Sequence, residues 1–330
     1  MSEHKGILVF CEVENGKLTS LATEMLGGGS RLSLASGGEL SAVLIGGNIS
    51  GLAAEAIAFG AQKVYVVEDP ALKDYSIEPY LIAIEKVIKQ VIPQIILLGQ
   101  TAAGRDLAPW LAFRLDSAAT MDCLALEIDS TTQRMLMTRP VYGGNAQAVQ
   151  VCEVDPQIAT VRSKALVALA RDNSRQGQVI NIAAGIDPAE VKTRVLERKI
   201  QATAGVKLED ARVVVAGGRG IGGVAGFEQL EEVARLLKGA VGATRPPCDN
   251  KWIADSRQIG LTGKVVSPDL YIAVGLSGAS QHLSGFSSAK VVVAINKDPE
   301  ANIFKVAKYG IVADWKAVLP AFAASLKVAV

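Results

Sequence analysis

The sequence carries little net charge and few aromatic side chains. Among its 330 residues, 34 are Lys or Arg and 33 are Asp or Glu, which gives a formal net charge of +1. Phe, Trp and Tyr together make up only 5% of the chain. Proteins that hold nucleic acid commonly use a basic surface and aromatic side chains on which bases stack. The composition therefore argues against a nucleic-acid-binding protein and against a surface that binds anionic membranes.

Cysteine and histidine are also scarce, with four cysteines and two histidines, His4 and His282. The four cysteines, Cys11, Cys123, Cys152 and Cys248, are far apart, and no two of them form a CxxC pair. This spacing argues against a zinc ribbon or an iron–sulfur cluster held within the chain. We expect reduced cysteines in a reducing, cytosol-like compartment, with Cys248 in a polar stretch as the exposed one.

The sequence has no long hydrophobic run. Its apolar stretches are short and broken by Gly or by charge, so we expect no transmembrane span and no direct insertion into a membrane. The N-terminal segment MSEHKGILVF lacks the long apolar core of a signal peptide and the Arg/Ser-rich character of a transit peptide. We therefore expect a cytoplasmic protein, in a bacterium rather than in the mitochondrial matrix.

The residues that are abundant predict an α/β protein with two domains. Hydrophobic residues make up 49% of the chain, and about 150 residues per domain suggests two domains. In the first half, short buried-type strands alternate with amphipathic helices, which predicts a parallel sheet covered on both faces. The first helix is expected to end at the glycines of residues 27–29. The expected strands are 6–13, 40–45, 63–67 and 94–98, and the expected helices are 18–26, 52–59, 78–92 and 105–115.

The pattern then changes to consecutive strands, which predicts an antiparallel extension of the first domain. These strands are expected at 123–128, 135–139, 146–153 and 158–162, with one more at 179–182. The charged stretch 188–210 reads as a linker, so the expected domains are 1–205 and 206–330.

The alternation restarts in the second half and predicts a smaller, doubly wound domain of the flavodoxin or Rossmann type. A helix is expected at 315–326, interrupted by Pro320. The other expected elements are strands at 211–216, 240–243, 270–274, 290–295 and 310–313 and helices at 227–237 and 301–308.

Two Gly-rich loops follow strands of this second domain. The loop of residues 275–282, GLSGASQH, offers backbone N–H groups and hydroxyls that suit a phosphate, and a plain Gly-rich turn is the alternative. The loop of residues 218–223, GRGIGG, fits the G-x-G-x-x-G pattern. However, no acidic residue lies between Glu232 and Asp249 to bind a ribose, so a standard nicotinamide site is disfavoured.

Polar side chains gather at the predicted carboxyl ends of this sheet, where open α/β sheets bind ligands. Arg219 would suit a pyrophosphate, with a solvated loop charge as the alternative. Two prolines after Arg245 are expected to hold it in an extended conformation, as an anion ligand or as a surface charge. No nucleophile–base pair is apparent, so we expect no hydrolytic or acyl-transfer site. The residues at these strand ends are Arg219, Thr244, Arg245, Thr262, Ser277, His282, Asn296 and Asp314.

The second half closely resembles the alpha subunit of electron transfer flavoprotein. The resemblance rests on GGRG, VGATRPPCD, IGLTGKVVSPDLYIAVGLSGASQHLSG, VVVAINKDPEANIF and YGIVADW, in that order, and covers residues 211–326 densely. The first half agrees in length and layout, with weaker signatures. The resemblance implies FAD held mainly by the second domain, with an electron transfer flavoprotein beta subunit that completes the site.

The resemblance also implies a role for each matched residue. Arg245 would lie against the isoalloxazine ring, Thr262 would hydrogen-bond flavin N5, and His282 would face the C2 carbonyl. Residues 277–281, Thr244 and Arg219 would line the ribityl–pyrophosphate stretch, and Asn296 and Asp314 would hold the adenosine. The family usually has Gln where this chain has Leu261, which puts the tuning of the flavin in question. The expected FAD-binding residues are Arg219, Thr244, Arg245, Ile259, Gly260, Leu261, Thr262, Ser277, Gly278, Ala279, Ser280, Gln281, His282, Asn296, Asp314 and Trp315.

The resemblance implies an electron-carrier subunit rather than an enzyme with its own substrate. Such a subunit shuttles electrons between acyl-CoA dehydrogenases or related flavoenzymes, as in fatty acid β-oxidation, and a quinone-linked oxidoreductase. One alternative is an electron-bifurcating form that uses NADH and ferredoxin and has a second FAD in the beta subunit. Another is a nucleotide-sensing module without redox activity, which would be colourless. A nicotinamide dehydrogenase ranks third, because the ribose-binding acid is missing.

Overall fold

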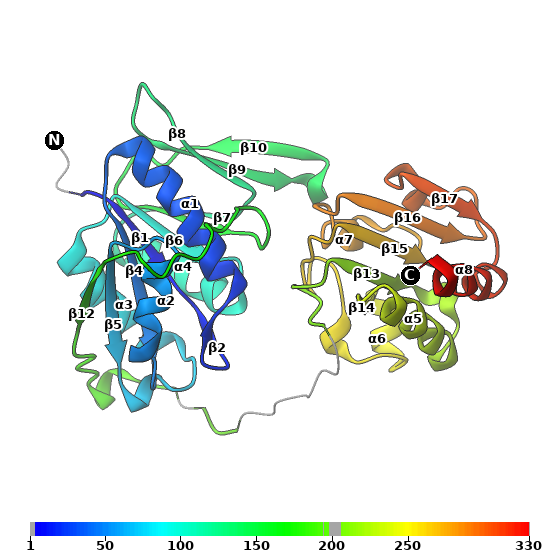
Figure 1. Ribbon diagram of the computed structural model, residues 1–330, viewed down its shortest axis with the longest axis horizontal. Helices are drawn as coiled ribbons and strands as arrows, with labels where there is room; N and C mark the ends of the chain where they lie inside the picture. The colour runs from blue at the N-terminus through cyan, green and yellow to red at the C-terminus, as the bar shows by residue number, and fades with distance from the viewer. Residues whose placement is uncertain (1–3, 194, 198–205, 330) are drawn as a thin grey trace. The chain divides into compact units, whose positions relative to one another are not determined.

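The computed structural model describes residues 4–193, 195–197 and 206–329 (Figure 1). The chain divides into two compact units, Met1–Val141 with Gln147–Lys199, and Tyr142–Ala146 with Ile200–Val330. Each unit is built around a parallel sheet, so the predicted α/β class with two domains is confirmed. The predicted domain boundary at 205/206 adjoins residues 198–205, which lie outside the described part of the chain, and it stays a prediction.

The first unit holds a seven-stranded sheet in which the strand pairs are parallel. In order across the sheet, the strands are β12 (Gln178–Asn181), β5 (Lys63–Glu68), β4 (Leu40–Gly46), β1 (Ile7–Phe10), β6 (Ile95–Gly99), β11 (Gln157–Val161) and β7 (Ala119–Cys123). The helices are α1 (Ser20–Ser36), α2 (Ala53–Ala58), α3 (Ile77–Val91) and α4 (Ala102–Arg114).

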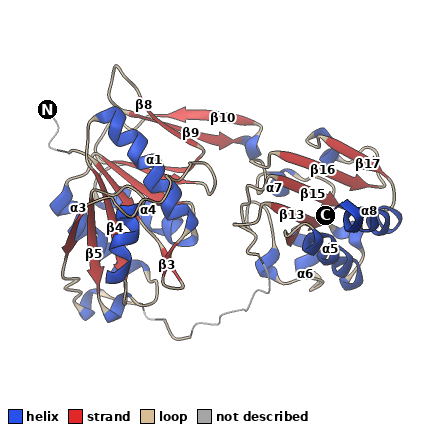
Figure 2. Cartoon of the chain, in the orientation of Figure 1, coloured by secondary structure: helices blue, strands red, loops and turns tan. Residues whose placement is uncertain are grey.

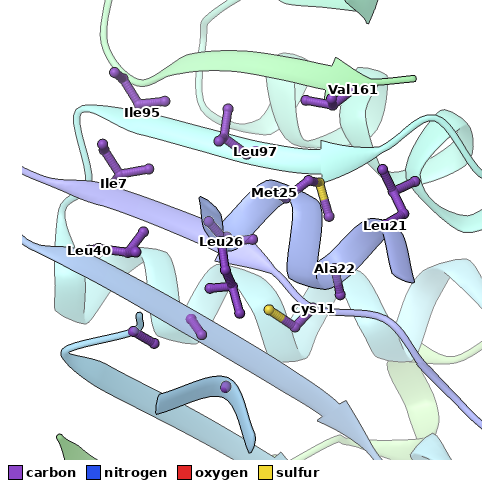
Figure 3. Close-up of a cluster of buried hydrophobic side chains, with 14 of the residues drawn as sticks. Ile7, Cys11, Leu21, Ala22, Met25, Leu26, Leu40, Ile95, Leu97 and Val161 are labelled. Carbon is purple, nitrogen blue, oxygen red and sulfur yellow. The ribbon is translucent and has the colours of Figure 1, made fainter. Parts of the chain in front are cut away.

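Two hydrophobic clusters cover the two faces of this sheet. Side chains alternate along a strand, so Ile7 of β1 packs in the cluster with α1 and α2, whereas Leu8 packs in the cluster with α3 and α4. Figure 3 shows Met25 and Leu26 of α1 together with Ile7 and Leu97 of the strands in the first of these clusters. The parallel sheet with helices on both faces, predicted from the alternating pattern, is therefore present.

The glycines of residues 27–29 do not end α1, contrary to the prediction. Thr19 caps the start of the helix, because its hydroxyl accepts a hydrogen bond from the Ala22 N–H, and Gly37, which has a φ of 69°, caps the end. A Cβ on Gly27 would lie 2.2 Å from the Val167 carbonyl oxygen. The glycines are buried where another segment packs closely on the helix, and this packing overrides their poor helix propensity.

The antiparallel extension is shorter than predicted. It consists of β8 (Ala125–Ile128), β9 (Met135–Val141) and β10 (Ala146–Gln150), and β8 pairs with β9 in the antiparallel direction. The strand expected at 158–162 is instead β11, which runs parallel between β6 and β7. All five residues of β11 are buried, as expected for a central strand with both faces covered. The prediction also missed β7, whereas the strand expected at 179–182 corresponds to β12.

The second unit contains a five-stranded parallel sheet. Its strands, in order across the sheet, are β14 (Ala240–Ala243), β13 (Val213–Gly217), β15 (Leu270–Val274), β16 (Val291–Asn296) and β17 (Tyr309–Val312). This is the 2-1-3-4-5 order of the flavodoxin-like doubly wound fold, so the predicted class is confirmed. The helices are α5 (Val224–Leu236), α6 (Arg245–Asp249), α7 (Ser280–Leu283) and α8 (Trp315–Ala329).

The two faces of this sheet are covered differently. Figure 2 shows α5 and α8 side by side, and Phe227 and Leu319 of these helices pack in one cluster with the strands. The opposite face is covered by shorter segments that include Phe286 and Ile303. Pro320 does not interrupt α8, contrary to the prediction.

Two further expectations about the second unit are wrong. The helix expected at 301–308 is only the short 3-10 helix η7 (Asn302–Lys305). Cys248 is buried rather than exposed, because α6 turns it toward the hydrophobic core, and burial raises the pKa of its thiol to about 11. All four cysteines are free and buried.

Several short elements lie between these helices and strands. Strand β1 is followed by a small antiparallel pair, β2 (Val13–Glu14) and β3 (Lys17–Leu18). The remaining 3-10 helices are η1 (Ser50–Leu52), η2 (Pro70–Leu72), η3 (Tyr142–Gly144), η4 (Pro188–Glu190), η5 (Arg219–Ile221) and η6 (Asp255–Arg257). Within the described ranges, no helix has both the length and the apolar character that crossing a bilayer requires.

Candidate functional site

The sheet of the second unit has a topological switch point between β13 and β15. After β13 the chain crosses to β14 on one side, and it later returns to β15 on the other side. The loops that leave β13 and β15 therefore diverge at the carboxyl ends of two neighbouring strands. Such a divergence opens a crevice in which α/β proteins of this type bind ligands.

These two loops touch each other through their backbones. The Gly220 N–H donates to the Gly275 carbonyl oxygen at 2.9 Å. A Cβ on Gly220 would lie 2.7 Å from the same oxygen, so the contact requires glycine. The indole N–H of Trp315, at the start of α8, donates to the Gly220 carbonyl at 2.9 Å. The Gly-rich loop is thus fixed from two directions.

A cavity of about 910 Å³ lies at this edge of the sheet. Its volume is within the range of ordinary cofactor sites. Most of the residues predicted from the strand ends line it together, although they come from separate loops. The predicted residues in the lining are Arg219, Thr244, Arg245, Ile259, Gly260, Leu261, Thr262, Ser277, Ala279, Gln281, His282 and Asn296.

Four predicted residues, Gly278, Ser280, Asp314 and Trp315, are not in the lining of this cavity. Asp314 accepts a hydrogen bond from the Lys316 N–H at the start of α8, and Trp315 holds the Gly220 loop. Gly278 lies so close to η7 that a Cβ would be 2.3 Å from the Ile303 nitrogen. Their direct contact with a ligand stays a prediction, whereas their structural contacts explain why the loops hold their shape.

Arg245 is the first residue of α6 and is not extended, contrary to the prediction. Thr244, which precedes Arg245, is extended and forms the N-cap of the helix. The two prolines that follow Arg245 suit the first turn of a helix. The Arg245 guanidinium Nε lies 3.3 Å from Asp249 Oδ2, one turn along the same helix. The Arg245 side chain is 69% exposed, so most of its surface is open to a ligand or to solvent.

The Thr262 hydroxyl is oriented by a neighbouring amide. Gln258 Nε2 donates to Thr262 Oγ1 at 3.0 Å. Because the oxygen accepts this bond, its own proton is available for donation to another acceptor. Thr262 is therefore suited to hydrogen-bond an unprotonated ring nitrogen or a carbonyl oxygen in the cavity.

Asn296 links the loops of two adjacent strands. Its Nδ2 donates to the Leu276 carbonyl at 2.9 Å, and its Oδ1 accepts from the Asp298 N–H at 3.0 Å. Both ends of the amide are thus already bonded to the backbone. Asn296 borders the cavity, and these bonds shape the cavity wall.

His282 is buried at the cavity wall, with only 5% of its surface exposed. Its Nδ1 lies 2.8 Å from the Ile259 carbonyl oxygen, and its Nε2 lies 2.9 Å from the Tyr271 hydroxyl. Burial lowers the pKa of the imidazole to about 4, so the ring is neutral at pH 7. The sequence had indicated His282, but it gave no sign of its bond with Tyr271.

The cavity also contains charged and polar residues that the sequence analysis missed. Lys297 and Asp298 follow β16 directly and line the cavity, so the strand-end rule that selected Asn296 also applies to them. Gln258 and Asp249 were missed because they lie at the ends of the short helices η6 and α6, which the sequence analysis did not predict. The side chains of Arg219 and Lys297 have no hydrogen bond or ion pair within the described part of the chain. These two cations are therefore available to an anion.

The lining suits a large, anionic, planar ligand. Cationic side chains and a glycine backbone can hold phosphates, whereas Ile259, Leu261 and Leu276 offer apolar contact. No group of three or more His, Cys, Asp or Glu residues within the described ranges is placed to hold a metal ion.

Comparison with known proteins agrees with this geometry. Residues 7–187 match the electron transfer flavoprotein domain, and residues 207–287 match the electron transfer flavoprotein FAD-binding domain. The chain is 45% identical over 328 residues to the electron transfer flavoprotein subunit alpha of Thermoanaerobacterium thermosaccharolyticum, covering 99% of each chain. It is 43% identical over 318 residues to the subunit of the same name from Bacillus subtilis, covering 96% of this chain and 95% of that one. It is 38% identical over 326 residues to protein FixB of Rhizobium meliloti, covering 97% and 92%.

These matches span both units, and the second match falls on the sheet that carries the cavity. FAD is the cofactor of the domain matched there. The chain therefore belongs to the electron transfer flavoprotein alpha subunit family.

Proposed function

We propose that this chain binds FAD in the cavity at the switch point between β13 and β15 and carries electrons as one subunit of a heterodimer. The observation that supports this most is the convergence of Arg219, Arg245 and Thr262, from three separate segments of the chain, on one cavity. When bound, FAD supplies the redox chemistry, and the chain supplies binding, orientation and charge.

The residues of the cavity would have different roles in binding FAD, according to their chemistry. Arg219 and Lys297 would bind the pyrophosphate, because both are cationic and unpaired within the described part of the chain. Arg245 would favour negative charge on the ring system, partly offset by Asp249. Thr262 would donate its hydroxyl proton, since Gln258 already donates to its oxygen.

Leu261 adds an apolar side chain to this arrangement. The residue is 63% exposed at the cavity, although its backbone N–H donates to the Gln281 carbonyl at 2.7 Å. An exposed leucine beside a polar cavity gains free energy by contact with the face or edge of an apolar ring. Leu261 would therefore contribute apolar contact with the ring system and no hydrogen bond.

The electron donors and acceptors belong to the proposal. We propose that acyl-CoA dehydrogenases or related flavoenzymes deliver electrons, as in fatty acid β-oxidation, and that a quinone-linked oxidoreductase receives them, in a bacterial cytoplasm. The alternatives are the bifurcating form and the nucleotide-sensing module without redox activity. The family supports electron transfer but does not choose the partners.

One experiment separates these functions. The chain is co-expressed with its beta subunit, bound flavin is counted, and NADH or a reduced acyl-CoA dehydrogenase is added while the visible spectrum is followed. We expect one FAD per heterodimer that the dehydrogenase reduces and NADH does not. Two FAD molecules with reduction by NADH would favour the bifurcating form, and a colourless complex would favour the nucleotide-sensing module.

We further propose that the first unit contacts the beta subunit. Trp110 and Phe113 support this proposal. All three tryptophans and seven phenylalanines of the chain lie in the described ranges, and only these two are exposed, by 49% and 80%. They lie three residues apart on the outer side of α4, and exposed Pro109 directly precedes Trp110, four residues before Phe113. Exposed aromatic side chains that cluster in this way are typical of protein–protein interfaces.

The test of this contact is a pair of substitutions. Phe113→Ser should weaken the heterodimer by at least about tenfold, which is about 1.4 kcal/mol. Leu34→Ser, which replaces an 83% exposed residue of α1, is the matched control and should leave the affinity unchanged. If Phe113→Ser assembles with the beta subunit as tightly as the native chain, the proposed contact is wrong.

A further inference from the structure

A second cavity, of about 610 Å³, lies in the first unit and shares no lining residue with the cavity of the second unit. Its walls come from β3, from η1 and α2, and from residues 171–177, the segment that precedes β12. The fold thus brings together parts of the chain that are far apart in sequence. The volume is within the range of sites that bind small molecules.

The charged side chains of this cavity are mainly cationic. The described residues of its lining include three cations, Lys17, Arg171 and Arg175, and one carboxylate, Glu55. Cations that gather on one concave surface repel one another, and an anion bound between them relieves this repulsion. The composition of the lining therefore favours an anionic ligand.

Arg175 is fixed at the end of α2. Its Nη1 donates to the Ala58 carbonyl at 2.7 Å, and carbonyl groups at the end of a helix have no partner within the helix. Its Nε lies 3.8 Å from Asp172 Oδ2, so this carboxylate offsets part of its charge. No hydrogen bond of its Nη2 falls within the described part of the chain, so that nitrogen keeps its donors for a ligand.

The segment that carries the two arginines is held in place by its own contacts. The Asp172 N–H donates to the same Ala58 carbonyl at 3.0 Å, and Asp172 Oδ1 accepts from the Ser174 N–H at 2.9 Å. A Cβ on Gly177 would lie 2.8 Å from Ile57 Cγ1, so the segment packs closely on α2. Donors that are positioned before the ligand arrives lower the entropic cost of binding.

Arg171, Asn173 and Lys17 offer further donors. Arg171 Nε donates to Asn173 Oδ1 at 3.1 Å, which leaves the Nη groups of Arg171 and the amide N–H groups of Asn173 without partners among the described residues. Lys17 has no hydrogen bond or ion pair in the same ranges. A phosphate group suits these donors, because guanidinium groups bind its oxygens in pairs and an ammonium group binds it as a point charge. It also has three terminal oxygens, whereas a carboxylate has two.

We propose that this cavity of the first unit binds a small molecule through its phosphate group, with Lys17, Arg171 and Arg175 as the residues that hold the phosphate. The site is separate from the cavity at the switch point, and the proposal does not depend on FAD. Glu55 adds a repelling charge that limits the affinity for the anion. Its Oε2 accepts a hydrogen bond from the Leu18 N–H at 3.4 Å, which gives this carboxylate a structural role.

Calorimetric titration with inorganic phosphate tests the proposal. The sample is the FAD-loaded heterodimer, so that FAD fills the cavity of the second unit, and chloride keeps the ionic strength constant. We expect saturable binding with a dissociation constant of about 1 mM or lower, and binding of succinate that is weaker by about tenfold or more. Equal affinity for succinate, or no saturable heat with phosphate, would overturn the proposal.

Two exposed cations show whether the phosphate lies in this cavity. Lys17→Gln and Arg171→Gln should each weaken phosphate binding by about tenfold, because each removes a charged donor. Arg175 is left intact, since its bond to the Ala58 carbonyl shapes the cavity wall. Lys89→Gln, at an exposed lysine of α3 in the same unit, is the matched control and should leave the affinity unchanged. Phosphate binding that Lys17→Gln and Arg171→Gln leave unchanged would place the ion elsewhere and overturn the proposal.

Glu55→Gln should have the opposite effect. Glutamine can still accept from the Leu18 N–H but carries no charge, so phosphate should bind about fivefold more tightly. An unchanged or weaker affinity would overturn the electrostatic basis of the proposal. Bound flavin is counted in every sample. If the native heterodimer holds no FAD, the proposed function fails, while the difference between the native chain and Lys17→Gln still decides this inference.

Discussion

The contact between Gly220 and Gly275 gives a sharp prediction for FAD affinity. A Cβ on Gly220 would lie 2.7 Å from the Gly275 carbonyl oxygen and 3.1 Å from the Gly275 Cα, and both are backbone atoms. Ordinary contact begins near 3.4 Å, so Gly220→Ala must separate the two loops by about 0.7 Å. The backbone of Gly220 is not in the left-handed region, so this separation is the main effect of the added methyl group.

The magnitude follows from the cost of forced packing. Overpacking of this kind costs about 1–3 kcal/mol. Since Gly220 and Gly275 both line the cavity, we expect a loss of FAD affinity of about tenfold to hundredfold in Gly220→Ala. The assay is FAD titration into the flavin-free heterodimer, followed by the flavin fluorescence, with thermal unfolding measured on the same samples.

Gly222→Ala is the matched control. Gly222 lies in the same loop with a φ of 83°, and nothing lies within 4 Å of the position of its Cβ. Alanine there should cost about 1–2 kcal/mol of stability through backbone strain without pushing the loops apart. If folded Gly220→Ala binds FAD as tightly as the native chain, or no more weakly than Gly222→Ala, the assignment of this cavity to FAD is wrong.

Three further predictions concern charge, packing and pH. Arg245→Gln should lower the first one-electron potential of bound FAD by about 40 mV, since contact between charges in a water-like dielectric is worth about 1 kcal/mol, and redox titration should show no change for the exposed cation of Lys251→Gln. Gly27→Ala should destabilise the chain by about 1–3 kcal/mol in chemical denaturation, because its Cβ would meet a backbone carbonyl at 2.2 Å, and a stabilised variant would contradict this. Hydrogen bonds from Lys290 and a neighbouring arginine lower the pKa of Asp269 to about 2, so its stabilising contribution is present above about pH 4 and lost as the pH falls toward 2. Asp269→Asn should flatten acid unfolding in that range, and an unchanged profile would refute it.

The second unit was the more predictable from sequence. The bounds expected for β14 and β15 are those observed, and both strands are almost wholly buried. Strands covered on both faces carry unbroken apolar runs, which stand out from the loops around them. The polar residues at the ends of such strands then fall at one edge of the sheet, which is why most of the cavity lining was predicted.

The errors arose where contacts distant in sequence decide the local structure. The glycines at 27–29 remain helical because another segment packs on them, and no local signal reports that packing. β11 follows a run of antiparallel strands, so its neighbours in sequence suggested the wrong partner, while its five buried residues fit the centre of the large sheet. Pro246 and Pro247 are compatible with an extended segment or with a first helical turn, and the structure adopts the helix.

The site could be predicted as a set of residues but not as a hydrogen-bond network. The contacts of His282 are with Tyr271, eleven residues earlier in the chain, and with the Ile259 carbonyl. The sequence cannot show which ring nitrogen faces which partner. The same holds for Thr262, whose availability as a donor depends on the amide of Gln258.

The central claim is that the second unit holds one redox-active FAD. The most direct test is a stepwise dithionite titration of the chain co-expressed with its beta subunit, followed by visible absorbance, with bound flavin counted after denaturation. We predict one FAD per heterodimer that takes up electrons in two separate one-electron steps. A colourless complex without FAD, or a flavin whose spectrum dithionite leaves unchanged, would contradict the claim.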